Sequence, residues 1–193
     1  MILSILLLII AALNYPGGNI RDIHSKGYSL NKNYISHLLE YHALNGMDNL
    51  ARPWGILGVE MMGITTGLAF VRFANKIDLK KYSSVIRFLG YTLILVTSLI
   101  TIPPWHDPMI TLGSIITLLL FFYVTVLFLQ SKLKSFKILS VLMILCFYGA
   151  TYMYFTRTAL DYLPAVQKSI HVFQIGFILG LEHCTSGEDF PRI

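Results

Sequence analysis

Apolar residues gather in long runs separated by short polar segments, and after residue 53 each run is long enough to cross a bilayer. A spanning helix needs about 20 mostly apolar residues because the hydrocarbon core is about 30 Å thick. The pattern therefore predicts an all-α, polytopic membrane protein, since only helices and closed barrels satisfy their backbone groups in lipid. The five spans expected in this part of the chain are Trp54–Val71, Phe88–Pro104, Met109–Leu129, Ile138–Phe155 and Ala165–Leu181.

The first apolar run, Met1–Leu13, is too short for a full span. We interpret it as a short first helix, which completes a bundle of six transmembrane helices and makes residues 1–193 one transmembrane domain. A signal peptide is the alternative for this run. Against it, no basic residue precedes the apolar stretch, and Ala11–Asn14 is not a convincing cleavage site.

Lysine and arginine are concentrated in two of the predicted loops. Residues 72–87 carry five of them and residues 130–137 carry three, whereas residues 105–108 carry none. Because basic loops stay in the cytoplasm, both dense loops and both termini are predicted to be cytoplasmic in the cell membrane. Residues 14–53 then form an extracytoplasmic loop, in which the apolar spacing predicts a short interfacial helix over Asn31–Leu44.

Composition supports the membrane class. Hydrophobic residues make up 55% of the chain and charged residues 13%, which excludes a disordered protein. Two cysteines exclude a disulfide scaffold. The net charge of +5 is explained by the basic loops, so we expect no nucleic-acid partner.

Polar chemistry collects on the side predicted to face outward. Five of the six histidines fall there, namely His24, His37, His42, His106 and His171. His106 and Asp107 stand between prolines at the membrane edge, and histidine exchanges protons near neutral pH. The candidate catalytic residues are therefore His106, Asp107 and His171.

The last predicted span carries a polar stripe. At 100° per residue, one narrow sector contains Gln167, His171, Gln174 and Glu182. Such a stripe is expected to face the bundle interior, where it either joins helices by hydrogen bonds or lines a polar cavity. Glu60 is acidic and lies deep within a span, so it is also expected to point into protein, next to the small-residue face of Gly63 and Gly67.

The candidate ligand-binding residues complete this outer site. Asn33 and Ser36 are expected to hold the long loop over the helix ends by hydrogen bonds, and Arg157 and Lys168 are expected to hold a phosphate. The full set of candidates for ligand binding is Asn33, Ser36, Glu60, Arg157, Gln167 and Lys168. No metal-binding spacing such as H-E-x-x-H occurs, so no metal ligand is assigned and the cofactor stays unknown.

The stretch Gly27–Leu38, with the sequence GYSLNKNYISHL, resembles the signature after the first helix of a prokaryotic membrane family known as domain of unknown function 998. The glycine-rich second span, Pro104 with His106 and Asp107, and the Gln167–Lys168 start of the last span follow in the same order. His37 departs from the family pattern, which has an acidic residue there. The resemblance implies six helices and an outward polar loop, but no known activity; more distantly the arrangement is similar to Frag1/DRAM/Sfk1-like proteins linked to lipid handling.

These observations predict a multi-pass membrane protein of uncharacterised biochemical role, whose outward polar pocket binds a lipid headgroup. Three alternatives stay open. The first is an intramembrane lipid hydrolase or headgroup transferase that uses His106 and Asp107 with His171, alone or with a metal. The second is a small transporter with a polar path from His171 past Glu60 to Glu182. The third is a structural subunit with a membrane-protein partner.

Overall fold

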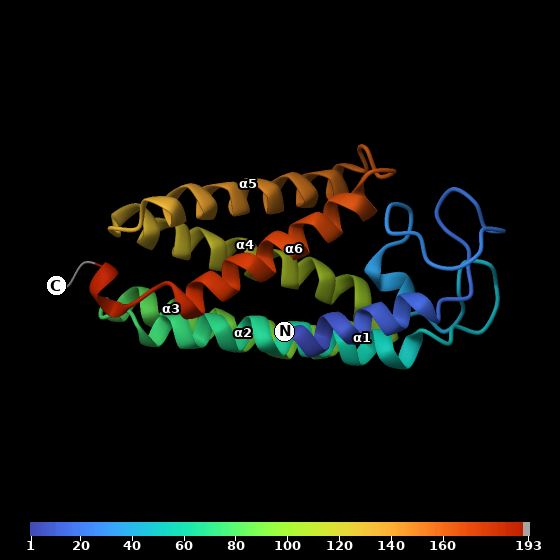
Figure 1. Ribbon diagram of the computed structural model, residues 1–193, viewed down its shortest axis with the longest axis horizontal. Helices are drawn as coiled ribbons and strands as arrows, with labels where there is room; N and C mark the ends of the chain where they lie inside the picture. The colour runs from blue at the N-terminus through green and yellow to red at the C-terminus, as the bar shows by residue number, and fades with distance from the viewer. Residues whose placement is uncertain (191–193) are drawn as a thin grey trace.

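The computed structural model describes residues 1–190 and is all-helical, as predicted. Six α-helices run roughly along the long axis of the molecule (Figure 1). Their bounds are α1 Ile2–Leu13, α2 Arg52–Asn75, α3 Lys80–Ile100, α4 His106–Gln130, α5 Lys134–Thr156 and α6 Leu163–His183. Three short 3-10 turns accompany them, namely η1 Ile35–Leu38, η2 Pro103–Trp105 and η3 Gly187–Asp189.

Four of the helices, α2 to α5, are long and apolar enough to cross a membrane. Helix α1 has twelve residues and is therefore about 18 Å long, short of the hydrocarbon thickness. Helix α6 has the length of a span, with 21 residues, but Gln167, Lys168 and His171 lower its hydropathy. The structure thus defines a membrane protein with four membrane-capable helices.

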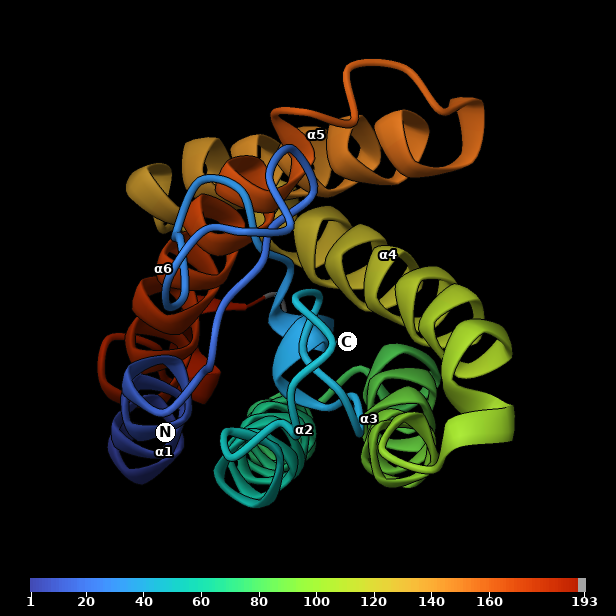
Figure 2. The same cartoon turned by 90° about the vertical axis from the view of Figure 1, so that its right-hand side faces the viewer.

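Viewed from the end that carries the long loop, the helices follow one another around a ring (Figure 2). Helices α1, α2 and α3 form one side, and α4, α5 and α6 close the ring. Helix α6 returns to contact α2, so the last helix packs against the first full-length one. The turn η1 lies inside this ring, at the end nearest the viewer.

The segment before α2 differs from the expectation of an interfacial helix over Asn31–Leu44. Only the 3-10 turn Ile35–Leu38 forms there, and it enters the end of the bundle instead of lying on a surface. The physical reason is local. The ring of His37 binds the backbone N–H of Tyr34, and Asn33 binds the N–H of Ser29, so side chains compete with helical hydrogen bonds.

Glycines let α2 and α3 approach closely, as the small-residue pattern predicts. A methyl group on Gly67 would lie 2.6 Å from the carbonyl oxygen of Gly90 on α3. One on Gly63 would lie 2.2 Å from the side chain of Thr97. The two backbones therefore meet where no larger residue fits on α2.

The half of the bundle away from the long loop is filled by an aromatic cluster. Its members are Phe70, Phe73, Phe121, Phe128, Phe136, Phe177 and Phe190. The ring of Phe128 stacks on Phe136 with centroids 4.9 Å apart, and on Phe73 at 5.7 Å. Since these rings come from several helices and from the segment after α6, they form the solid core of the bundle.

Lys76 fixes the end of α6 against α2. Its Nζ donates to the carbonyl oxygens of Leu181 at 2.9 Å, Glu182 at 2.7 Å and Thr185 at 3.1 Å. These carbonyls belong to the last turn of α6 and the residues after it, where backbone acceptors have no helical partner. An ammonium group here also complements the negative end of the helix dipole.

We expect Lys76→Met to lower the free energy of unfolding by about 2 kcal/mol, because charge-assisted hydrogen bonds to the α6 terminus are lost. Thermal unfolding in detergent micelles measures this change. Lys80→Met is the matched control, since Lys80 is exposed at the start of α3 and should shift stability by less than about 0.5 kcal/mol. Equal stability of the two variants would contradict the capping role of Lys76.

Candidate functional site

The long loop, residues 14–51, is built by side chains that bond to its own backbone. Asn33 is fully buried: its Oδ1 accepts from Ser29 N at 2.9 Å and its Nδ2 donates to Gly18 O at 2.8 Å. Asn49 Nδ2 donates to the carbonyls of His37 and Glu40, each at 2.9 Å. These bonds replace regular secondary structure and give the loop a defined shape.

This loop is docked on the turn between α5 and α6. Arg21 pairs with Asp161 at 3.0 Å, and Tyr34 donates its hydroxyl to Leu160 O at 3.3 Å. The start of α6 contributes two further contacts. Gln167 Oε1 accepts from Ile35 N at 3.2 Å, and Lys168 Nζ donates to the carbonyls of Asn33 and Pro164. The loop therefore covers the helix ends, and it is held there by Asn33, Gln167 and Lys168; the structure gives the side chain of Ser36 no such bond among the described residues.

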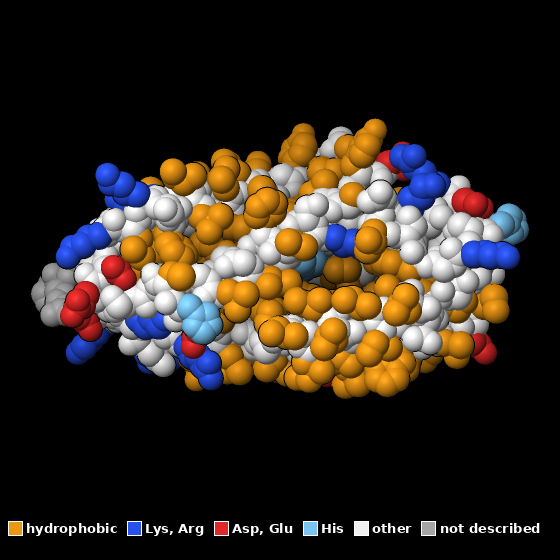
Figure 3. All heavy atoms as spheres, in the orientation of Figure 1, with side chains coloured by type: hydrophobic (Ala, Val, Ile, Leu, Met, Phe, Trp, Pro, Cys, Tyr) orange, Lys and Arg blue, Asp and Glu red, His pale blue; other side chains and the backbone are white. Residues whose placement is uncertain are grey.

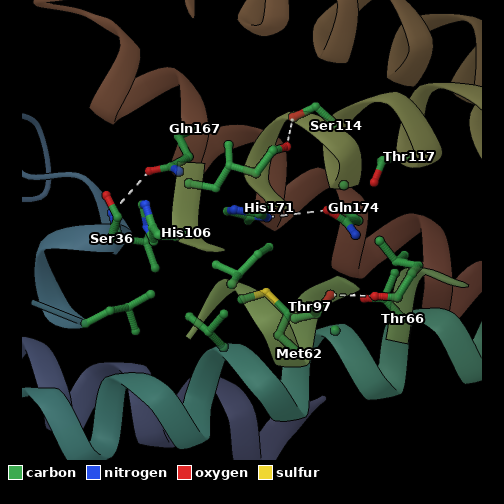
Figure 4. A pocket seen from close by; sticks show the side chains of 18 of the residues that line it. Ser36, Met62, Thr66, Thr97, His106, Ser114, Thr117, Gln167, His171 and Gln174 are labelled. Carbon is green, nitrogen blue, oxygen red and sulfur yellow. Dashed lines mark hydrogen bonds between the residues drawn. The ribbon is translucent and has the colours of Figure 1, made fainter. Parts of the chain in front are cut away.

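Two adjoining cavities lie beneath the loop. The first, called the inner cavity, has a volume of about 220 Å³ and is lined by η1 and by helices α2 to α6. The second, called the rim cavity, has about 310 Å³ and lies between η1, α4, α5 and α6. Both are lined by Ser36, His106, Ile110, Ser114, Phe147, Gln167 and His171, several of which appear in Figure 4.

The inner cavity has mainly apolar walls, with a few hydroxyl, amide and imidazole groups among them. In the part of the chain that the structure describes, no carboxylate, lysine or arginine lines it. Two of its hydroxyls are bound to their own helix, Thr97 to Leu93 O at 2.8 Å and Ser114 to Ile110 O at 2.9 Å. Thr66 Oγ1 is buried and has no hydrogen-bond partner among the described residues. A ligand here meets hydroxyl, amide and imidazole groups set in apolar walls.

His106 is the side chain of the site that is best placed to contact a ligand. Its Nδ1 lies 2.9 Å from Asp107 Oδ1, so Nδ1 carries the proton and donates to the carboxylate. Its Nε2 is buried without a partner in the described residues. The imidazole lines both cavities. Nε2 is thus left as an acceptor for a hydroxyl, an amine or a water in the cavity.

Three of the four residues of the polar stripe of α6 face the interior, where they line a cavity. Gln167, His171 and Gln174 line the inner cavity, and His171 Nδ1 lies 3.4 Å from Gln174 Oε1. Glu182 continues the stripe outside the cavity, where it pairs with Arg72 at 3.3 Å.

Phenylalanines lie about one turn beyond three of the polar residues that line the inner cavity. Phe70 follows Thr66 by one turn on α2, Phe121 follows Thr117 on α4, and Phe177 follows Gln174 on α6. All three rings are fully buried, and Phe121 lies 5.8 Å from Phe70 and 5.6 Å from Phe177 between ring centroids. We call these three rings the phenylalanine floor, and Phe177 lies between His171 and Glu182 along α6.

The structure brings most of the candidate residues together. Ser36, His106, Gln167 and His171 line both cavities, and Asp107 and Arg157 line the rim cavity. The guanidinium of Arg157 lies 5.3 Å from the ring centroid of Tyr154.

Three candidates lie outside the two cavities. Asn33 and Lys168 hold the loop in place, as their hydrogen bonds show. Glu60 accepts a hydrogen bond from Thr101 Oγ1 at 3.0 Å, at the end of α3. Among the described residues, no group of three or more His, Cys, Asp or Glu side chains could hold a metal ion.

Sequence inspection missed the hydroxyl residues of the inner cavity, which are Thr66, Thr97, Ser114 and Thr117. A usable signal was the spacing of Ser114 and Thr117, which places both on one face of α4.

Comparison of the chain with known protein families, with curated proteins and with solved structures finds no match. The resemblance to domain of unknown function 998 therefore stays a prediction.

Proposed function

We propose that this chain is a six-helix, multi-pass membrane protein that binds the headgroup of a membrane lipid in the cavities beneath its long loop. The observation that carries the proposal is the buried, unpartnered Nε2 of His106 in a cavity with apolar walls. Binding sites for small amphiphiles combine such walls with a few placed polar groups.

The charges at the rim cavity favour a phospholipid. Arg157 supplies a cation that can meet a phosphate, and Asp107 supplies an anion that can meet an amine. Lys168 donates to the carbonyl oxygens of Asn33 in the loop and Pro164 on α6, and it is left out of the headgroup contacts. A zwitterionic headgroup, with a phosphate and an amine, complements both rim charges.

A lateral route for a lipid is visible on the surface. Figure 3 shows a hollow between α6 and α1, within which a histidine and a basic side chain can be seen. Hydrophobic side chains surround this hollow. A lipid whose chains stay in the bilayer could therefore reach the polar groups of the cavities sideways, without crossing the loop.

The distribution of basic residues supports the orientation. The basic residues of 72–87 and 130–137 belong to the end of the bundle opposite the long loop. The positive-inside rule therefore supports a cytoplasmic position for that end and for the C-terminus, with the cavities on the outer side. Met1 lies against Thr65 in the middle of α2, so the structure does not bring the N-terminus to that end.

The His106–Asp107 pair favours a second candidate function, an intramembrane lipid hydrolase. In this function Nε2 would take a proton from water while the water oxygen attacks an ester, and the departing alcohol would receive that proton. Asp107 would hold the ring with its free nitrogen toward the cavity. Release of a soluble headgroup or a fatty acid from phosphatidylethanolamine would identify this activity.

Native mass spectrometry of the gently purified protein tests the binding proposal. From bilayers with equal phosphatidylethanolamine and phosphatidylglycerol, we expect one retained lipid per chain, with phosphatidylethanolamine preferred. His106→Ala should lower the occupancy at least fivefold, which corresponds to about 1 kcal/mol. Its melting temperature should change little, because the His106–Asp107 pair is at the surface end of α4.

His42→Ala is the matched control. His42 also pairs with an aspartate, Asp48, at 3.2 Å, but both side chains are exposed and neither lines the two cavities. This variant should retain lipid like the unmodified protein. A wild-type protein without bound lipid, or equal occupancy in the two alanine variants, would refute lipid binding at His106.

A further inference from the structure

The segment that closes the cavities contains a histidine held in one protonation state. We call residues 33–39 the lid segment, because Ile35, Ser36 and Leu39 line the inner cavity and Tyr34 and Ser36 line the rim cavity. His37 lies in the middle of this segment. Its ring is part of the lid's internal bonding and does not line either cavity.

The hydrogen bonds of His37 require a neutral ring. Its Nδ1 lies 3.2 Å from Tyr34 N and 3.2 Å from Asn33 Nδ2. A backbone N–H and an amide NH₂ can only donate, so Nδ1 must offer its lone pair and the proton must be on Nε2. Protonation of Nδ1 would remove the acceptor for both donors at once.

The surroundings of His37 oppose protonation further. Lys168 faces it from α6, and its ammonium also donates to Asn33 O within the same lid segment. On its own segment, the ring of Tyr34 meets the imidazole edge-on with centroids 5.3 Å apart. Burial first, and the charge of Lys168 second, lower the pKa of His37 from 6.5 to about 4.

We propose that His37 is a pH-sensitive latch, and that its protonation releases the lid segment and opens the lipid-binding cavities. The inference rests on the proposed function for the identity of the ligand that enters the cavities. The motion of the lid segment does not depend on the proposed function. A charged His37 would lose its two hydrogen bonds and would repel Lys168, whose bond to Asn33 O anchors the same segment. Release would also free Ile35 N from Gln167.

The sign of the pH dependence follows from the lowered pKa. An unlatched His37 has a pKa near its ordinary 6.5 and binds a proton more readily than the latched one. The lid is therefore most stable above pH 6.5. Its stability falls as the pH drops from 6.5 toward 4, so opening is expected in mildly acidic medium.

Cysteine labelling of the full chain tests the latch. Cys146 and Cys184, both exposed, are first changed to serine, and Ser36→Cys is then introduced into the lid segment. Labelling by a water-soluble maleimide is compared at pH 7.5 and pH 4.5 in lipid nanodiscs. Each rate is divided by that of a Lys32→Cys protein, since Lys32 is exposed and corrects for the reactivity of the thiol itself. We expect the corrected rate to rise at least fivefold at pH 4.5.

His37→Asn separates the latch from other pH effects. The Oδ1 of asparagine is bonded to Cγ, as Nδ1 of histidine is, so it can accept from both donors but cannot be protonated. In this variant the corrected rate should stay low at both pH values. His24→Asn, at an exposed position of the same loop, should keep the full pH response. An unchanged wild-type rate, or the same rise in His37→Asn, would overturn the proposal.

Lipid retention distinguishes failure of the latch from failure of the proposed function. Exchange of phosphatidylethanolamine into the protein with native Ser36 is followed by native mass spectrometry at the two pH values. Faster exchange at pH 4.5, absent in His37→Asn, supports the latch. Retention that is independent of pH, together with unchanged labelling, would reject the latch and leave lipid binding intact. A pH-dependent labelling rate without any retained lipid would support the latch and reject the proposed function.

Discussion

Replacing Ser114 with phenylalanine is expected to lower lipid occupancy more than tenfold while leaving the bundle folded. Ser114 lines both cavities, so a benzyl ring at this position occupies the space that the two share. Its hydroxyl bonds to Ile110 O at 2.9 Å on its own helix, and losing such a bond costs a helix little. A tenfold loss corresponds to about 1.4 kcal/mol of binding free energy. Native mass spectrometry of the protein from lipid bilayers measures it.

Ser169→Phe provides the control for Ser114→Phe. Ser169 makes the same type of bond, to Ala165 O at 3.1 Å, but is exposed on α6 and lines neither cavity. This variant should bind lipid normally. If Ser114→Phe and Ser169→Phe retain equal amounts of lipid, the retained lipid belongs to the outer surface of the bundle and not to the cavities.

Gly67→Leu is expected to have the largest effect on stability. Even the first carbon of a side chain at this position would lie 2.6 Å from a backbone carbonyl, that of Gly90 on α3. A backbone atom cannot move aside as a flexible side chain can, so α2 and α3 must separate. Overpacking of this kind should lower the free energy of unfolding by about 3 kcal/mol or more. Thermal unfolding and the yield of monodisperse protein in detergent report the change.

Gly176→Leu tests whether the loss comes from the helix contact and not from the leucine. Gly176 is exposed on α6, and nothing lies within 4 Å of a methyl group added there. Leucine is a better helix former than glycine by roughly 0.5–1 kcal/mol, so this variant should be as stable as the wild type or more so. Two equally unstable leucine variants would argue against close packing of α2 on α3.

The helices could be predicted because apolar runs mark them directly. The run Trp54–Val71 lies within the membrane-capable helix α2, and Ile138–Phe155 lies within α5. The observed helices extend beyond these runs because helical hydrogen bonds continue into polar residues. Helix α4 starts at His106, earlier than the predicted Met109, so the His106–Asp107 pair is part of its first turn.

The site residues whose directions follow from helical periodicity could be predicted from the sequence. Those whose positions depend on the conformation of the loop could not. One turn of α6 separates Gln167 from His171, so their shared direction follows from sequence spacing. The position of Ser36 over the cavities depends on Asn33 and Gln167, which bind the backbone of the loop. The position of Glu60 could likewise be predicted only in part. Its charge at depth was evident in the sequence, but its partner Thr101 is brought to it by the packing of α3 on α2.

The phenylalanine floor has an electrical consequence. In the proposed orientation, the cavities lie at the outer end of the bundle beneath the lid segment, and the apolar aromatic cluster fills the rest of the bundle. A transmembrane potential then falls almost entirely across the aromatic half, which is the insulating layer. Moving one charge across the full potential is worth about 2.3 kcal/mol per 100 mV, but a headgroup above the floor crosses only a small part of it. Affinity for a charged headgroup should therefore be the same in energised and de-energised membranes.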